Sequence, residues 1–252
     1  MLGGSAAGAN SGQGCSGYLV ESGNTRLVLD LGPGTFIELR NHTDYRTLSA
    51  VILSHFHADH VLDVVALRFA LAYNPVAASR LLPLWIPPGG SARLAGLAMA
   101  FGETGKENEF FPSVFAVREF DPDVPLVIGG MEVRFAPTVH YVPCWAMRLT
   151  AGKSVLGYTA DTGPAAPLDG LLNGVDVLIA EGTHVEPTAE DTATRGHLTA
   201  GEAGDLATRV GASSLLLTHL WQEKGFDAYR AQAGGTFNGD LQLATRGHSL
   251  NW

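Results

Sequence analysis

The sequence is poor in charged residues and in cysteine and has no long hydrophobic run. Charged residues make up 16% of its 252 residues and hydrophobic residues 46%, which is typical of a chain that folds around a core and excludes a disordered one. Cys15 and Cys144 are too few for a disulfide framework, so we expect free thiols in a reducing cytoplasm. The most apolar segment, 61–73, is interrupted by Asp63 and Arg68, so no membrane span is expected.

Basic residues are also scarce. The chain has 16 Lys and Arg against 25 Asp and Glu, and its formal net charge is −9. Such a chain gains no general electrostatic attraction to a polyanion, which disfavours nucleic acid as the main substrate. Residues 1–10 are small and uncharged and lack a basic region followed by an apolar one. We therefore predict no secretory signal and a cytoplasmic protein.

Short apolar runs alternate with helical patterns along the whole chain. This alternation predicts sheets covered by helices, an α/β layered architecture, and we interpret residues 1–252 as one domain. Thr199 and Glu202 fit a capping box at the start of the last predicted helix. The expected strands are 17–20, 26–31, 50–53, 82–86, 144–150, 154–159, 175–180, 214–218 and 241–245, with further strands within 114–137; the expected helices are 61–73, 91–101 and 199–210.

What the chain does have is an unusual concentration of histidine. The segment Ser54-His55-Phe56-His57-Ala58-Asp59-His60 carries three of its nine histidines and a carboxylate. These side chains are ligands of Zn²⁺ and similar ions. His55 and His57, two apart in an extended loop, can share one ion, while Asp59 and His60 face a second. The segment therefore predicts two metal ions held side by side.

Further metal-competent residues follow the ends of predicted strands, where ligands collect in layered α/β proteins. Taken singly, a histidine after a strand is usually an ordinary one, and an Asp before Thr-Gly can be a turn residue. Glu202 is explained by the capping box, and His42 and His248 are interpreted as surface residues. Convergence makes a metal site the better interpretation for His55, His140, Asp161, Glu181 and His219.

The chain resembles the metallo-β-lactamase fold superfamily. The segment from His55 to His60 matches the signature His-x-His-x-Asp-His, and His140, Asp161 and His219 follow in the family's order. The resemblance covers nearly the whole chain and implies a four-layer αββα sandwich, with two mixed sheets inside and helices on both outer faces.

The resemblance also implies a dinuclear metal centre. Oxygen-reducing diiron members carry Glu at the position of His57, so redox chemistry is set aside. The implied cofactors are two divalent ions, with Zn²⁺ expected and Mn²⁺ and Fe²⁺ as alternatives. The implied ligands are His55, His57 and His140 for the first ion, Asp59, His60 and His219 for the second, and Asp161 for both.

Two further segments look like the tRNase Z branch. They are Glu181-Gly182-Thr183-His184 and Gly196-His197-Leu198-Thr199. By analogy, His197 lies beside the leaving group and gives it a proton, Glu181 orients His197, and Asp59 holds the nucleophilic water while it binds metal. The stretch 29–35 resembles the same branch. Within it, Asp30 is either a carboxylate that supports the ligand loop or a turn residue at the end of a strand.

The chain departs from full tRNase Z enzymes in one respect that bears on substrate. Those enzymes insert a long tRNA-gripping arm between the third His and the bridging Asp, whereas the interval from His140 to Asp161 is enough only for a hairpin. The residues after His219 also differ from the usual pattern. The chain is closer to armless bacterial members, some of which are linked to cyclic-nucleotide hydrolysis.

These observations lead to one functional hypothesis and three alternatives. We expect a phosphodiesterase that uses hydroxide held between the two metals to attack a small phosphodiester such as a cyclic nucleotide. The alternatives are an endoribonuclease that processes tRNA 3′ ends, a hydrolase of a lactone, thioester or sulfate ester, and a binding protein without catalysis. No membrane partner is expected, and a homodimer is one expectation because dimerisation is common in the resembled branch.

Overall fold

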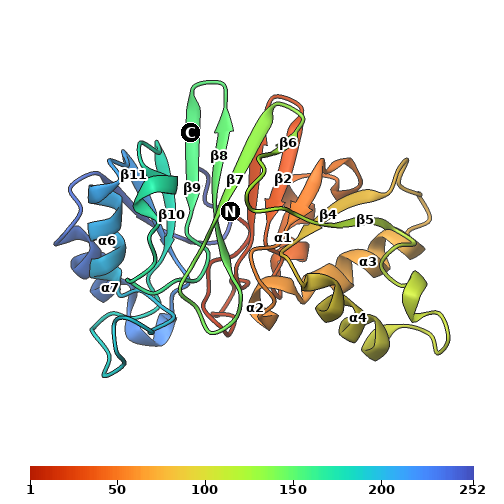
Figure 1. Cartoon of the computed structure of the whole chain (residues 1–252), viewed down its shortest axis with the longest axis horizontal. Helices are drawn as coiled ribbons and strands as arrows, with labels where there is room; N and C mark the ends of the chain where they lie inside the picture. Colours follow the sequence, from red (N-terminus) through yellow and green to blue (C-terminus); the bar gives the residue numbers. More distant parts are fainter.

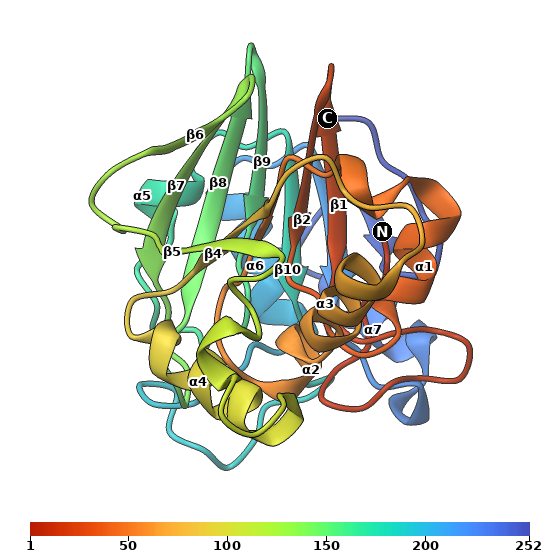
Figure 2. The same cartoon turned by 90° about the vertical axis from the view of Figure 1, so that its right-hand side faces the viewer.

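The computed structural model describes residues 1–252 and contains two sheets packed face to face between outer helices (Figure 1). The first sheet has the strand order β1-β2-β3-β4-β5 and the second the order β12-β11-β10-β9-β8-β7-β6. Helices α3 and α4 cover the first sheet, and α6 and α7 cover the second (Figure 2). The predicted αββα sandwich is confirmed.

Both sheets are mixed, as predicted. β1 and β2 are antiparallel, whereas β2 to β5 run parallel. In the second sheet, β6 to β9 are antiparallel and β9 to β12 are parallel. The strands are β1 Tyr18–Ser22, β2 Thr25–Leu29, β3 Ala50–Ile52, β4 Leu82–Ile86, β5 Phe115–Glu119, β6 Leu126–Ile128, β7 Met131–Pro137, β8 Trp145–Ala151, β9 Ser154–Tyr158, β10 Val177–Glu181, β11 Ser214–Thr218 and β12 Asp240–Leu243.

The helices depart from the sequence prediction in four places. The expected helix 61–73 is two helices, the first of which begins at Ala58, and three further helices, α1, α5 and α7, were not predicted. None of the helices has the length and apolar content that crossing a bilayer requires. The α-helices are α1 Thr35–His42, α2 Ala58–Val61, α3 Asp63–Tyr73, α4 Gly90–Phe101, α5 Asp169–Leu172, α6 Ala200–Arg209 and α7 Phe226–Gly234.

Alternation of side chains along the strands divides the apolar residues into three layers. Leu27 and Leu29 of β2 face the second sheet, while Val28 between them faces the helices. On β11, Leu216 faces inward and Leu215 and Leu217 pack under α6 and α7. The sheets therefore share one core and each has a second core under its helices. The strand ends between these layers are held firmly enough to support a site.

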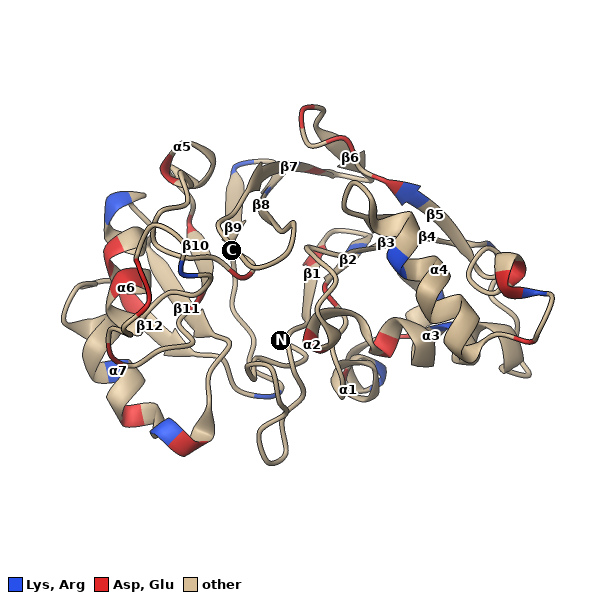
Figure 3. Cartoon of the chain, turned by 60° about the horizontal axis from the view of Figure 1, so that its bottom comes forward, with Lys and Arg blue, Asp and Glu red and all other residues tan.

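The interval from His140 to Asp161 forms the hairpin of β8 and β9, as expected. No inserted arm leaves this edge of the sheet. Lys and Arg lie scattered over the ribbon without forming a continuous basic stripe (Figure 3), while Asp and Glu occupy α6 and the loop before it. This distribution agrees with the acidic composition.

The capping box predicted at the start of α6 gives a test of local stability. Glu202 donates its backbone N–H to the Thr199 hydroxyl at 3.1 Å, and the Glu202 carboxylate accepts from the Thr199 N–H at 2.8 Å. We predict that Thr199→Ala lowers the free energy of unfolding by about 1 kcal/mol, because one donor at the helix end loses its acceptor. Urea denaturation of metal-loaded protein measures the change. Thr199→Ser keeps the hydroxyl and serves as the control; an equal loss in both variants would contradict the capping explanation.

Candidate metal centre

The predicted site residues gather at one edge of the sandwich, where strands from both sheets end. His55 and His57 follow β3, and Asp59 and His60 lie in the short helix α2. His140, Asp161 and His219 follow β7, β9 and β11. Their ligand atoms form two overlapping groups, each with all its atoms within 4.8 Å of one another: His55, His57, His140 and Asp161, and Asp59, His60, Asp161 and His219.

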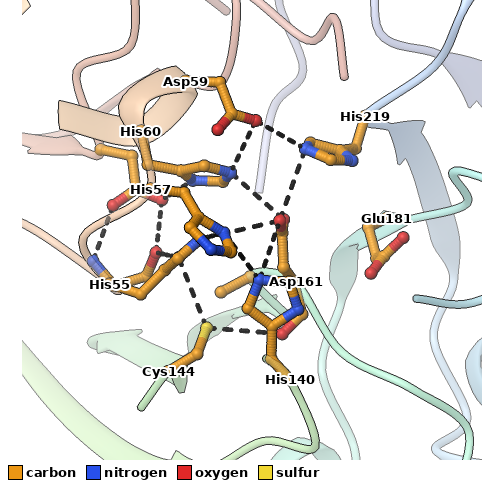
Figure 4. A network of polar contacts seen from close by, with 12 residues as sticks. His55, His57, Asp59, His60, His140, Cys144, Asp161, Glu181 and His219 are labelled. Atoms are coloured by element: carbon orange, nitrogen blue, oxygen red, sulfur yellow. Dashed lines mark hydrogen bonds and ion pairs between the residues drawn. The ribbon is translucent and has the colours of Figure 1, made fainter. Parts of the chain in front are cut away.

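The Asp161 carboxylate belongs to both groups and lies between them (Figure 4). One of its oxygens is 3.7 Å from the Nε2 atoms of both His55 and His140, and the other is 3.2 Å from His60 Nε2. Burial opposes charge on Asp161, but the surrounding imidazoles, His219 first among them, outweigh it and hold the pKa of the carboxyl well below its usual range. Asp161 is therefore a carboxylate anion that both groups of candidate metal ligands can share.

The imidazoles are oriented so that their Nε2 atoms face the centre of the cluster. His140 Nδ1 donates to the Gly196 carbonyl at 2.8 Å and His60 Nδ1 donates to Asp30 at 2.8 Å, so Nε2 of each ring is the nitrogen left to bind a metal. Burial lowers the pKa of His60, but the carboxylates of Asp161 and Asp30 outweigh it and raise the pKa well above its usual range, so a bound ion would displace a proton there. His140 Nε2 lies 2.9 Å from His57 Nδ1, and the buried His60 Nε2 has no hydrogen-bond partner. Nitrogen acceptors packed against one another and against carboxylates fit divalent cations.

Burial also favours the neutral form of the first group of histidines, which is the form that binds metal. It lowers the pKa of His55, His57 and His140, and neighbouring histidines lower it further. These three rings pack edge to face with centroids 4.8 to 5.0 Å apart. The chemistry of the donor set thus matches the two ions predicted from sequence.

A carboxylate beneath the ligand loop holds that loop in place. Asp30 accepts from the backbone N–H of Ser54 at 2.7 Å, from its hydroxyl at 2.6 Å and from His60 Nδ1. The Tyr158 hydroxyl, from the opposite sheet, donates to it at 2.7 Å. Of the two interpretations of Asp30, the structure matches the supporting carboxylate. Ser54 Oγ lies in turn 3.0 Å from His55 Nδ1, so Asp30 acts on histidines of both groups.

His197 lies next to this centre and is paired with Glu181, as the sequence analysis expected. His197 Nδ1 is 2.9 Å from the Glu181 carboxylate, and the ring stacks on His219 with centroids 5.4 Å apart. Burial would lower the pKa of His197, but the Glu181 charge outweighs it and raises the pKa to about 9. His197 therefore carries a proton at neutral pH. The His197 side chain is 17% exposed, so its proton is accessible to a molecule bound at the site.

The loop that carries His197 is anchored by residues that sequence reasoning missed. The guanidinium of Arg195 is almost fully buried, donates to the His197 carbonyl at 2.9 Å and pairs with Glu202. Gly163 lies so close that a Cβ there would meet the Arg195 carbonyl oxygen at 1.6 Å. Nothing in the pattern Thr194-Arg195-Gly196 distinguishes this arginine from a surface one.

Thr183 and Cys144 also contact the site without having been assigned a role. The Thr183 hydroxyl lies 2.7 Å from both His219 Nδ1 and the Glu181 carboxylate. Cys144 Sγ is 3.5 Å from His55 Nδ1 and 3.4 Å from the Asp161 carbonyl oxygen, to which it donates. The one sequence feature that pointed to Thr183 is its place in the Glu181-Gly182-Thr183 segment.

The other residues named from the sequence lie around the site or away from it. His184 is half-buried, with its ring centroid 6.0 Å from that of His197, and Cys15 is buried. His42 is exposed and pairs with Glu38 at 2.9 Å, as a surface residue would. His248 is half-buried rather than fully exposed, which corrects its interpretation as a surface residue; the chain around residues 244–248 packs against the N-terminal residues and hides its Nε2.

Comparison with known proteins places this geometry in a family. Residues 25–220 match the β-lactamase superfamily domain. The probable metallo-hydrolase YhfI of Bacillus subtilis (strain 168) is 31% identical over 238 residues, which cover 92% of this chain and 90% of that protein. The crystal structure of YhfI superposes with a TM-score of 0.84 at 30% identity, over 98% of this chain and 96% of that one.

More distant structures share the fold alone. A diphosphatase from the PhnP family superposes with a TM-score of 0.74 at 17% identity, over 100% of this chain and 96% of that one. The short form of human tRNase Z gives 0.72 at 18% identity, over 96% and 94% of the two chains. The family match over residues 25–220 and the likeness to YhfI, together with the His/Asp cluster at the strand ends, show that the chain is a metal-dependent hydrolase of the metallo-β-lactamase superfamily.

Proposed function

We propose that this protein is a phosphodiesterase that cleaves a small phosphodiester such as a cyclic nucleotide. The observation that carries the proposal is the imidazole of His197, whose Nδ1 is held 2.9 Å from the Glu181 carboxylate beside two converging groups of metal ligands. An ester with a poor leaving group, such as an alkoxide, needs a proton donor of this kind. Human tRNase Z and the PhnP-family diphosphatase, which share the fold, act on phosphate bonds by their names.

In the proposed site, His55, His57 and His140 would hold one ion, Asp59, His60 and His219 would hold the other, and Asp161 would serve both. Two divalent ions would lower the pKa of a bound water and offset the charge of the phosphate, and Zn²⁺, Mn²⁺ or Fe²⁺ suits these ligands.

The chain's own side chains then supply positioning and a proton. Asp59, whose carboxylate is 3.1 Å from His219 Nε2, orients the attacking water. His197 protonates the departing alkoxide, and the Glu181 carboxylate stabilises the imidazolium before the transfer.

The absent arm and the scarcity of basic residues favour a small substrate over tRNA. The β8–β9 hairpin occupies the place of an insertion. The 16 Lys and Arg are outnumbered by 25 Asp and Glu and lie scattered along the ribbon (Figure 3), which disfavours contact with a long RNA backbone.

A panel of substrates tests the proposed function. Metal-reconstituted protein is assayed with 2′,3′- and 3′,5′-cyclic AMP, bis-p-nitrophenyl phosphate, a precursor tRNA, a lactone and a thioester. We expect the highest kcat/KM on a cyclic nucleotide. Preferred hydrolysis of the lactone or thioester, or cleavage of the precursor tRNA at low enzyme concentration, would overturn the proposal in favour of the corresponding alternative.

The roles of His197 and Asp161 predict opposite phenotypes. We expect His197→Ala to retain both ions and to lower kcat by about 10²–10⁴-fold, because only the proton donor is lost. Asp161→Ala should lose metal, because both groups share this carboxylate. Metal content by mass spectrometry and steady-state kinetics separate the two effects. His42→Ala, at an exposed histidine, is the matched control and should change neither. A metal-free His197→Ala protein would show that His197 is a ligand.

Asp30 should control metal affinity without touching metal. All four groups that hydrogen bond to its oxygens are donors, so Asp30→Asn places an amide N–H₂ against one of them. We predict a fall in metal affinity of about 10- to 100-fold, measured by competition with a chromophoric chelator. Tyr158→Phe removes one donor and leaves the other three, so its effect should be smaller. Unchanged affinity in Asp30→Asn would contradict the supporting role.

A further inference from the structure

An aromatic ring lies exposed beside the proposed leaving-group end of the site. Tyr141 directly follows the ligand His140, and the centroids of these two rings are 5.2 Å apart. Its ring centroid is 5.7 Å from that of His197. Despite these contacts the residue is 56% exposed, so much of the ring faces solvent. Neither the metal centre nor the proton transfer gives this ring a task.

The ring is held in position although it is exposed. A Cβ on Gly196 would lie 2.7 Å from ring atom Cε2, so the ring packs directly on the glycine backbone. At its far end the Tyr141 hydroxyl donates to the Glu190 carboxylate at 2.8 Å. A side chain fixed at both ends and open on the remaining surface has already lost its rotational freedom. It can therefore bind a flat ligand at little entropic cost.

We propose that Tyr141 forms a stacking subsite for the base of a nucleotide substrate, an inference that rests on the proposed phosphodiesterase function. The phosphorus of such a substrate lies at the metals and its leaving oxygen at His197. Its base then extends beyond His197, on the side where Tyr141 lies. Aromatic side chains bind any base through its π-face.

The charges around Tyr141 favour a neutral ring over additional phosphate. Glu186, Glu190 and Asp191 lie on one exposed loop, of which Glu190 contacts the Tyr141 hydroxyl. Arg195, the one Lys or Arg in the segment 182–199, is buried and paired with Glu202. A second phosphate near Tyr141 would meet these carboxylates, and the nearby charge of His197 is already paired with Glu181. An uncharged base meets no such penalty. The subsite therefore selects a mononucleotide diester over a polynucleotide or a nucleoside diphosphate.

The test compares substrates with and without a base. Both 2′,3′-cyclic AMP and glycerol 1,2-cyclic phosphate contain a five-membered cyclic diester, and only the first carries a base. For Tyr141→Ala we expect KM for cyclic AMP to rise about 10- to 100-fold, with kcat and the kinetics on the glycerol substrate little changed. Tyr141→Phe keeps the ring and should stay within about threefold of wild type. Tyr73→Ala, at an exposed tyrosine on α3, is the control.

Binding of adenosine 5′-monophosphate, measured by calorimetry, separates this inference from the proposed function. Weaker binding to Tyr141→Ala than to wild type supports the subsite even if wild type hydrolyses neither diester, a result that would overturn the phosphodiesterase proposal alone. Equal KM and Kd values in wild type and Tyr141→Ala would overturn the subsite while leaving the phosphodiesterase proposal in place. An equal loss on both substrates would also overturn it, since the effect would then not concern the base.

Discussion

One buried carboxylate joins the two sheets directly beneath the cluster of imidazoles. Asp30 ends a strand of the first sheet and accepts a hydrogen bond from Tyr158 of the second. It also accepts from Ser54 and His60 on the ligand loop. This carboxyl group is fully buried, and the groups that hydrogen bond to it all donate, so none of its partners leaves it unsatisfied. The spacing between the sheets and the orientation of the histidine side chains thus depend on the same four hydrogen bonds to Asp30.

Backbone strain is concentrated at this edge of the molecule. The three non-glycine residues with left-handed backbone conformation are Asp30, Ala160 and His219, with φ values of 56°, 51° and 62°. Each lies just after the end of a strand. Asp30 and His219 are themselves residues of the site, and Ala160 immediately precedes Asp161. Such conformations cost about 1–3 kcal/mol each and persist only where the surroundings enforce them. The parallel strands and the three hydrophobic cores hold these residues in the left-handed conformation. The packing of the rest of the molecule therefore maintains the geometry of the site.

The sequence predicted those features that depend on a repeated pattern or a dense motif. The strands, their layering and the convergence of His55, Asp161 and His219 followed from alternation and from polar residues at strand ends. Helices α1 and α7 were missed because each buries only a few residues against its sheet, too few for a visible apolar stripe. Arg195 and Thr183 were missed for another reason. The packing of loops brings Arg195 to Glu202 and Thr183 to His219. The Glu-x-Thr spacing indicates only the contact of Thr183 with Glu181.

The ligands of the proposed centre come from segments spread between His55 and His219 and from both sheets. A metal pair that binds them all acts as a cross-link between distant parts of the chain. The metal pair would bring together ligands that are far apart in the sequence. Folding of the sandwich already brings these residues together, so folding and not metal binding carries most of the loss of chain entropy. Metal loading would then tie the two halves of the molecule into a single cooperative unit of unfolding. The same ions that supply the chemistry would thereby protect the protein against partial opening and proteolysis.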